Sequence, residues 1–372
     1  MHVLFHSSWY PSRLHPTLGN FVQRHAEAVA TRHRVTVLHT VADPAVRTLE
    51  VHDARRGDLR ELIAYHPPGR IGPQAALQAL RQVALHADRA DVLHGHVLKP
   101  AAMGMLWLRR KFDLPLIVTE HWTGYHRTAD AHVHWAMRTL MRRAAAKAAF
   151  LCPVSDDLGR AMRGFGLHGR YRTVPNVVDT TVFTPATVAR PDGRFRLLHV
   201  STLHDPQKNI SGLLRAFAEA RVHEPALQLV LAGDGDAGAY RPLAASLGLH
   251  APDLIMHGAF PPEGIARLMH EADAFVLASR YENMPCVLLE AMATGLPVLS
   301  TRVGGIAEQV GARQGLLVPP DDHRTLVDGL VRMAKERDRF DRPGIGTYAA
   351  ERFSVPVVAA AYDTCYREAM GG

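Results

Sequence analysis

The stretch from Ala274 to Val298, AFVLASRYENMPCVLLEAMATGLPV, decides the fold class. Residues 274–279 form a short apolar run that is typical of a buried strand, and residues 280–284 read as a loop. Pro285 suits the first position of a helix, and Gly295 is a helix stop signal. A buried strand that runs directly into a helix is half of a βαβ unit, whose strands lie parallel. This stretch therefore predicts an α/β fold.

The same alternation of apolar runs and longer helical patterns extends along the chain. Such runs occupy 2–8, 34–40, 91–97 and 115–121 in the first half, and 195–202, 227–235, 254–260, 274–279 and 297–302 in the second. Strands separated by helices imply right-handed crossovers and parallel sheets that are covered on both faces. We predict two Rossmann-like, doubly wound parallel-sheet domains that face each other across a cleft, with ligands at the strand-to-helix loops.

The segment between these halves, Val174 to Arg194, carries three prolines and a Pro-Asp-Gly turn signal without helical periodicity. We predict a linker there. The expected domains are an N-terminal domain over 1–180 and a C-terminal domain over 195–353, followed by a terminal helix within 354–372.

Composition limits the function classes. The chain has 372 residues, a formal net charge of +7 and a pI of about 9.5, which favours anionic partners. No helix-turn-helix or RNA-binding motif accompanies the basic residues, so we expect no nucleic-acid partner. The three cysteines, Cys152, Cys286 and Cys365, lie far apart and outside any C-x-x-C spacing. With neither a signal peptide nor an apolar run long enough to span a membrane, the sequence predicts a cytoplasmic protein.

Two glutamates and a lysine could carry chemistry at the predicted strand ends. Glu282 precedes the helix after Pro285, and Glu290 lies inside that helix, beyond amides near Val287 and Leu288 that would favour a phosphate. Lys208 could supply a point charge for a leaving diphosphate without a metal. Taken singly, each of these side chains would more often be a solvent-exposed residue without a binding role. Taken together, the three could bind a nucleotide sugar.

Several motifs resemble the family 4 retaining glycosyltransferases, also called glycosyl transferases group 1, which have the two-domain GT-B fold. The element of two glutamates separated by seven residues is ENMPCVLLEAMATGLPV. The other matching motifs are PTLGNFVQRHAEAVA (16–30), PVSDDL (153–158), VPNVVDTTVF (174–183), QKNISGLLRAF (207–217), VGGIAEQV (303–310) and GLLVPPDD (315–322). The resemblance spans nearly the whole chain.

The resemblance implies roles for individual residues. Glu282 would bind the donor sugar near the reacting centre, Glu290 the ribose hydroxyls, and Lys208 the leaving diphosphate. His121 would contact the donor sugar from the N-terminal domain. Gly19 and Asn20 would let backbone amides approach the phosphates.

Other residues of the donor site depart from the family pattern. Thr202 stands where many relatives have an arginine. Asn283, Met284 and Pro285 replace a Gly-aromatic-Gly sequence, and Pro285 has no amide hydrogen to donate. The resemblance therefore does not transfer sugar specificity.

The resemblance implies a metal-independent retaining hexosyltransferase without a cofactor, which moves a sugar from a UDP or GDP donor to an acceptor hydroxyl. The acceptor would be a carbohydrate or lipid-linked molecule in cell-surface polysaccharide or glycolipid assembly. The terminal helix would pack back toward the N-terminal domain. The base, sugar, acceptor, linkage, pathway and oligomeric state are not defined by the sequence.

Three alternatives remain open at this stage. Asp234 and Asp236 form a D-x-D pattern that could hold a metal, although a strand running into a glycine turn is the preferred interpretation. A nucleotide-sugar epimerase would share the fold. A non-catalytic module could bind nucleotide sugars or the inner membrane face through the basic stretch 134–150.

His94 and His96 suggest a metal pair, but no third ligand is recognisable, so strand-end packing is the preferred interpretation.

Overall fold

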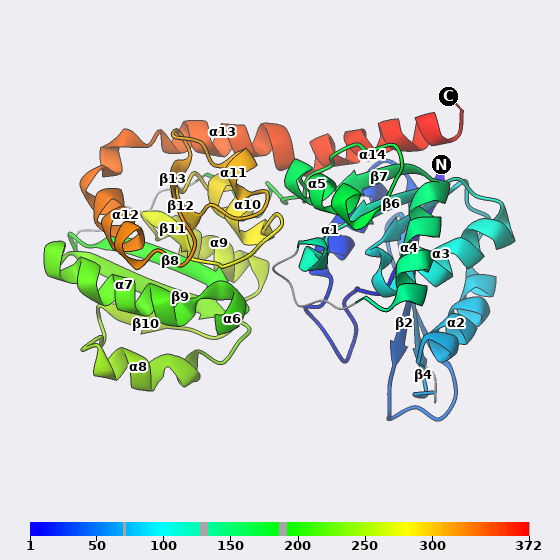
Figure 1. Ribbon diagram of the computed structural model, residues 1–372, viewed down its shortest axis with the longest axis horizontal. Coiled ribbons are helices and arrows are strands. Elements are labelled where there is room, and N and C mark those ends of the chain that lie inside the picture. The colour runs from blue at the N-terminus through cyan, green and yellow to red at the C-terminus, as the bar shows by residue number, and fades with distance from the viewer. Residues whose placement is uncertain (70–71, 127–132, 186–191, 372) are drawn as a thin grey trace. The chain divides into compact units, whose positions relative to one another are not determined.

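The computed structural model describes residues 1–69, 72–126, 133–185 and 192–371. The chain divides into two compact units, which are described separately (Figure 1). Unit 1 comprises Met1–Val177 and Val355–Gly372, and unit 2 comprises Val178–Ser354. The predicted linker falls partly on residues 186–191, which lie outside the described residues.

In its described part, unit 1 is built on a seven-stranded sheet with the order β3-β4-β2-β1-β5-β6-β7. The strands are parallel except β3, which pairs antiparallel with β4. They are β1 (His2–Ser7), β2 (Arg34–Ala42), β3 (Glu50–Arg56), β4 (Leu59–His66), β5 (Val92–His96), β6 (Leu116–Glu120) and β7 (Ala148–Pro153). The order of the parallel strands reverses between β1 and β5, which is where such sheets bind ligands.

The helices of unit 1 include one from the end of the chain. They are α1 (Asn20–Ala30), α2 (Gly72–Val83), α3 (Leu98–Phe112), α4 (Trp135–Lys147), α5 (Asp156–Phe165) and α14 (Val355–Ala369), with 3-10 turns η1 (Ala84–His86) and η2 (Thr123–Tyr125). In α1, Val22, His25, Ala26 and Val29 follow the spacing of a buried helical stripe. Helix α14 packs against α1, β6 and β7, and its Tyr362 and Tyr366 are part of the core of unit 1.

Unit 2 contains a six-stranded parallel sheet with the order β10-β9-β8-β11-β12-β13. The strands are β8 (Phe195–Ser201), β9 (Leu227–Gly233), β10 (Leu254–Met256), β11 (Ala274–Leu277), β12 (Val298–Thr301) and β13 (Gly315–Val318). This is the Rossmann order, and it reverses between β8 and β11.

Helices connect the strands of unit 2 throughout. They are α6 (Asp205–Lys208), α7 (Ile210–His223), α8 (Arg241–Ser246), α9 (Pro262–His270), α10 (Cys286–Ala293), α11 (Ile306–Gln309), α12 (His323–Lys335) and α13 (Arg342–Phe353), with 3-10 turns η3 (Ala237–Tyr240) and η4 (Arg337–Arg339). Helices α7 and α12 pack side by side (Figure 1).

The basic stretch 134–150 is a helix for most of its length. Helix α4 buries Met141, Ala144 and Ala145, while its arginines and Lys147 are exposed, so one face is packed and the other is basic. The helix ends at Lys147, and the last three residues of the stretch begin β7 instead. Among the described residues, no helix combines the length and apolar character that crossing a membrane requires.

Candidate active site

The loops at the strand-order reversal of unit 2 carry most of the predicted site residues. Strand β8 ends at Ser201 and leads through Thr202 to α6, while β11 leads through the 278–285 loop to α10. Because β8 and β11 are neighbours in the sheet, their carboxyl ends meet at one edge. Two segments that are distant in the sequence thereby form a single site.

Lys208 and Glu282 form a buried ion pair at this edge. The ammonium Nζ of Lys208, at the end of α6, contacts Oε1 of Glu282, and the two side chains are 10% and 7% exposed. The Ser279 hydroxyl donates a 2.8 Å hydrogen bond to the same carboxylate oxygen, and Nε2 of Gln207 lies 3.5 Å from the other oxygen. The Glu282 carboxylate is therefore oriented by three side chains.

Arg280 joins the two loops that bear this pair. Its amide donates to the Gln207 carbonyl at 2.8 Å. Its guanidinium donates to the Asp205 carbonyl at 2.8 Å and to Oδ1 of Asn209 at 2.7 Å, and its Nε donates to Asp321 at 2.8 Å. These bonds position the turn that carries Lys208 against the loop that carries Glu282.

Gly304 allows a second loop to approach the Glu282 backbone closely. Its φ is +52°, and a Cβ at this position would lie 1.9 Å from the Glu282 carbonyl oxygen. The next amide, that of Gly305, donates to the Asn283 carbonyl at 2.8 Å. No other residue type could supply this approach without moving the Glu282 backbone.

His199, on strand β8, links that strand to its neighbour β11. Its Nδ1 lies 2.9 Å from the Val276 carbonyl and its Nε2 2.8 Å from Oγ of Ser201. Burial lowers the pKa of His199 to about 4, with the nearby Lys208 charge acting in the same direction. The ring is therefore neutral at pH 7, and its hydrogen bond to Val276 links β8 to β11.

The predicted D-x-D pattern lies in a tight turn after β9. A Cβ at Gly235 would lie 2.1 Å from the Thr202 carbonyl oxygen, so this turn packs directly against the end of β8. Oδ1 of Asp236 accepts a 2.8 Å hydrogen bond from the Gly238 amide. Close packing and capping account for the glycine and for Asp236.

Helix α10 carries the remaining predicted donor residues of unit 2. Pro285 is the residue before its first turn, and the Leu288 amide donates to the Pro285 carbonyl at 3.1 Å, with Val287 just before it. Glu290 is buried within the helix. Asn283 and Met284 are buried in the preceding loop. The structure thus gathers Thr202, Lys208, Glu282 and these residues around one sheet edge and the helix next to it.

The predicted residues of unit 1 lie around its own strand-order reversal. Gly19 has a φ of +72° and precedes α1, and a Cβ there would lie 2.4 Å from the backbone carbon of Trp9. Close packing of the 7–20 loop therefore requires a glycine whether or not the loop binds phosphate. Asn20, the first residue of α1, is exposed.

His121 directly follows β6 and is held through its backbone. Its amide donates to Oε1 of Glu120 at 2.8 Å. The Glu120 carboxylate also accepts from the amides of Leu98 and Trp122 and from the Tyr125 hydroxyl. Burial raises the pKa of Glu120.

Sequence reasoning missed Ser279, Gln207, Arg280 and Gly304. Their signals are faint, because a serine, a glutamine and an arginine in loops are common and only the topology reveals their shared target. No third ligand for His94 and His96 was recognisable in the sequence, whereas the structure places His25 and His121 near His96.

Two family models match the chain. The model described as Glycosyltransferase Family 4 matches residues 18–182, and the model described as Glycosyl transferases group 1 matches residues 194–336. The chain belongs to the family 4 glycosyltransferases. The predicted family is therefore confirmed.

A curated relative agrees with this assignment. The MMP α-(1→4)-mannosyltransferase of Mycolicibacterium hassiacum is 29% identical over 337 residues, which cover 84% of this chain and 79% of that protein. The alignments to the first curated relatives are shorter and span 46% and 60% of those proteins.

Solved structures confirm the GT-B fold. Sucrose-phosphate synthase from Thermosynechococcus elongatus superposes with a TM-score of 0.78 at 19% identity, covering 100% of both chains. Anabaena HepE in complex with UDP superposes with a TM-score of 0.77 at 19% identity, covering 99% of this chain and 100% of that one. At this identity the likeness establishes the fold alone.

Proposed function

We propose that this glycosyltransferase transfers a sugar from a nucleotide-diphosphate donor, UDP or GDP, to an acceptor hydroxyl with retention of anomeric configuration. The observation that carries the proposal is the buried Lys208–Glu282 pair at the strand-order reversal of unit 2. A cation and a carboxylate held together there suit a diphosphate and a sugar that are joined by the bond to be broken.

The pair can bind a donor without giving up its own contact. An ammonium has three N–H donors, so Lys208 can contact Glu282 with one and offer the others to diphosphate oxygens. Negative charge that develops on the leaving diphosphate is then stabilised by a fixed cation, and no metal or cofactor is required. Thr202, in place of an arginine, adds a hydroxyl but no second cation.

The other residues of the site have complementary roles in this proposal. The amides at the start of α10, near Val287 and Leu288, favour phosphate, and Glu290 accepts hydrogen bonds from the ribose hydroxyls. Asn283 and Met284 line the sugar. In unit 1, His121 contacts the donor sugar, while Gly19 and Asn20 bring backbone amides to the phosphates.

The proposed chemistry needs no protein nucleophile. The acceptor oxygen forms a bond to the anomeric carbon on the face from which the diphosphate leaves, and the acceptor proton passes to the leaving phosphate oxygen. Glu282, oriented by Ser279, stabilises positive charge that develops on the sugar ring. In this proposal the protein residues bind and orient the donor and stabilise the charge that develops during transfer.

The acceptor in this proposal is a carbohydrate or a lipid-linked molecule in polysaccharide or glycolipid assembly, at the cytoplasmic face of the membrane. A specific observation favours a membrane contact: α4 exposes Trp135, whose side chain is 74% exposed, beside its basic face. Cosedimentation with vesicles containing anionic lipid should fall when salt is raised and when Trp135 and Arg142 are replaced by alanine. Cosedimentation that neither change affects would contradict this contact.

Product stereochemistry tests the proposed reaction. With methanol as a surrogate acceptor, a UDP- or GDP-sugar should yield a methyl glycoside with the anomeric configuration of the donor, as read by proton NMR. A glycoside of inverted configuration would overturn retention. Conversion of the donor sugar to its epimer without glycoside formation would identify an epimerase.

A further inference from the structure

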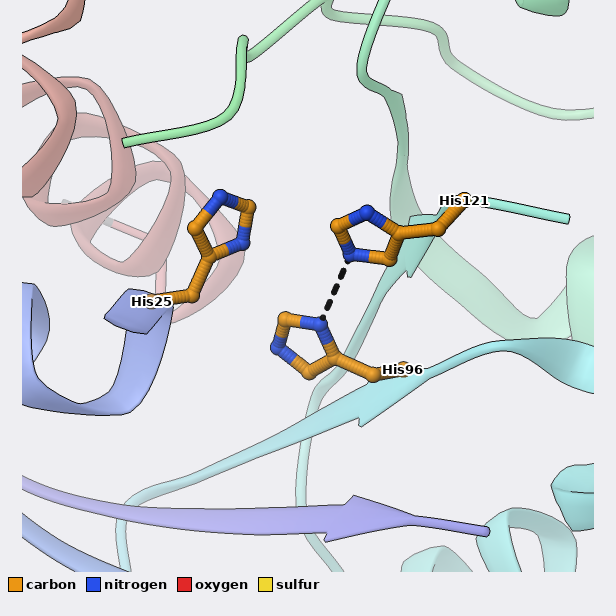
Figure 2. A group of neighbouring side chains, drawn as sticks. All are labelled: His25, His96 and His121. Carbon is orange, nitrogen blue, oxygen red and sulfur yellow. Dashed lines mark hydrogen bonds between the residues drawn. The ribbon is translucent and has the colours of Figure 1, made fainter. Parts of the chain in front are cut away.

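Three buried histidines converge in unit 1 from three different elements. His25 comes from α1, His96 from the end of β5 and His121 from the residue after β6, and Figure 2 shows the rings pointing toward one another. His25 and His96 are 0% exposed and His121 is 8% exposed. One nitrogen from each ring can be chosen so that the three lie within 4.8 Å of one another, and no other such group of ligating side chains occurs among the described residues.

The spacing of one pair already matches a chelated ion. Two imidazole nitrogens bound to tetrahedral zinc at about 2.05 Å lie about 3.3 Å apart. Nδ1 of His96 and Nε2 of His121 are 3.3 Å apart and share a hydrogen bond, so metal binding requires the shared proton to move to the other nitrogen of its ring. Bringing the third nitrogen to the same spacing requires it to approach by at most about 1.5 Å, which small ring rotations supply.

Groups around the cluster orient the rings. Metal-bound histidines usually donate their second N–H to a carbonyl or carboxylate. Here the Pro175 carbonyl bonds the His25 ring and the Asn176 side chain bonds the His121 ring. The Tyr362 hydroxyl lies 3.2 Å from Nδ1 of His25.

The charge state also suits a metal. Burial lowers the pKa of His25 to about 3 and holds the pKa values of His96 and His121 well below the usual value. All three rings are therefore neutral at pH 7, the form that binds metals. The His94 ring packs at a tilt against that of His96, with ring centroids 4.3 Å apart, but its two nitrogens contact the Tyr366 hydroxyl and Thr119 Oγ1, so its role is packing.

We infer that His25, His96 and His121 form a site for one divalent transition-metal ion of the zinc class, with a further position open to water. Three imidazoles are a ligand set that zinc, copper, nickel and iron accept and that magnesium and calcium do not favour. The ion is not a catalyst of sugar transfer in this account. If the proposed function holds, the bound ion inhibits sugar transfer. It occupies the His121 nitrogen nearest His96 and so holds the His121 ring away from the donor sugar.

Cobalt binding tests the site without reference to activity. Chelator-treated full chain should bind one Co²⁺ with visible absorption typical of low-coordinate cobalt, and Zn²⁺ should displace it. His25→Gln and His96→Gln should each weaken this binding at least tenfold, while His52→Gln, which removes an exposed histidine from β3, should leave it unchanged. Absence of a one-to-one cobalt spectrum in the wild type, or equal loss in the His52 variant, would overturn the inference.

A second measurement avoids variants that fail to fold. X-ray absorption of the wild type loaded with one equivalent of Zn²⁺ should show three imidazole ligands, and fewer than two would contradict the cluster. Zinc should also inhibit donor turnover in the wild type. Binding without inhibition would preserve the site and count against the proposed role of His121, so the two failures are distinguishable.

Discussion

Replacing Lys208 by methionine should destabilise unit 2 strongly, because it leaves the Glu282 carboxylate buried without its cation. The side chains of the pair are 10% and 7% exposed, so solvent screens the charges little. Two unit charges about 4 Å apart interact by about 4 kcal/mol at an effective dielectric of 20, and removing one partner of a buried pair costs about 3–5 kcal/mol. We expect about 3 kcal/mol or more for Lys208→Met and somewhat less for Glu282→Gln, which still accepts the Ser279 hydrogen bond.

The double variant provides the matched control. With both charges removed, no uncompensated charge is buried, and the introduced methionine would occupy the volume of the lysine stem. The double variant should therefore lie within about 1–2 kcal/mol of the wild type, with a coupling energy of at least about 2 kcal/mol. Donor turnover should be lost in both single variants and should not return in the double variant.

Urea unfolding can assign the effect to unit 2. The chain has four tryptophans, Trp9, Trp107, Trp122 and Trp135, and all belong to unit 1. Tryptophan fluorescence therefore follows unit 1, whereas far-UV circular dichroism follows both units. If the units unfold separately, the single substitutions should lower the urea midpoint followed by circular dichroism more than the midpoint followed by tryptophan fluorescence. A coupling energy below about 0.5 kcal/mol would refute the account of a buried, mutually dependent pair.

Three further predictions concern strain, pH and metal. Gly304→Ala should reduce donor turnover at least tenfold, because the new Cβ displaces the Glu282 backbone. Gly57 has a similar φ but open space around it, so Gly57→Ala should leave turnover unchanged. Equal effects of the two substitutions would contradict the steric argument. Because His199 has a pKa of about 4 when folded and near 6.5 when unfolded, its stabilising contribution is lost as the pH falls from about 6.5 toward 4, by about 2 kcal/mol at pH 5. The melting temperature should thus fall less between pH 7 and pH 5 in His199→Asn than in the wild type. An equal fall in both proteins would argue against this contribution of His199. Turnover should persist in EDTA, and its loss would indicate a required metal.

The repeating pattern of buried strands and helices was sufficient to predict the α/β class, because a parallel strand buried on both faces is apolar throughout. Strand β3 was missed for the opposite reason. Its sequence, EVHDARR, is mostly exposed and polar, and its structure depends on antiparallel pairing with β4. Strand β7 was hidden because it begins directly after Lys147, where an alanine-rich segment continues the helical pattern.

The residues of the candidate site could be singled out from the sequence, but the contacts between them could not. Glu282 and Lys208 could be singled out from motifs, yet their pairing depends on β8 and β11 being neighbours, which no local pattern encodes. His25 occupies a regular position in the buried stripe of α1 and is indistinguishable from a core residue in the sequence. Its relation to His96 and His121 follows from the packing of α1 against the sheet.

The role of Lys208 and Glu282 in donor turnover can be measured as nucleotide release from UDP-, GDP- and ADP-sugars in EDTA. The comparison is between the wild type, the Lys208→Met/Glu282→Gln double variant and Lys335→Ala, which removes an exposed lysine of α12 in the same unit. We expect the wild type and the Lys335 variant to release nucleotide from one donor, and the folded double variant to be at least about 100-fold slower. Full turnover by the double variant, or a wild type that neither hydrolyses nor binds any of these donors, would contradict this expectation.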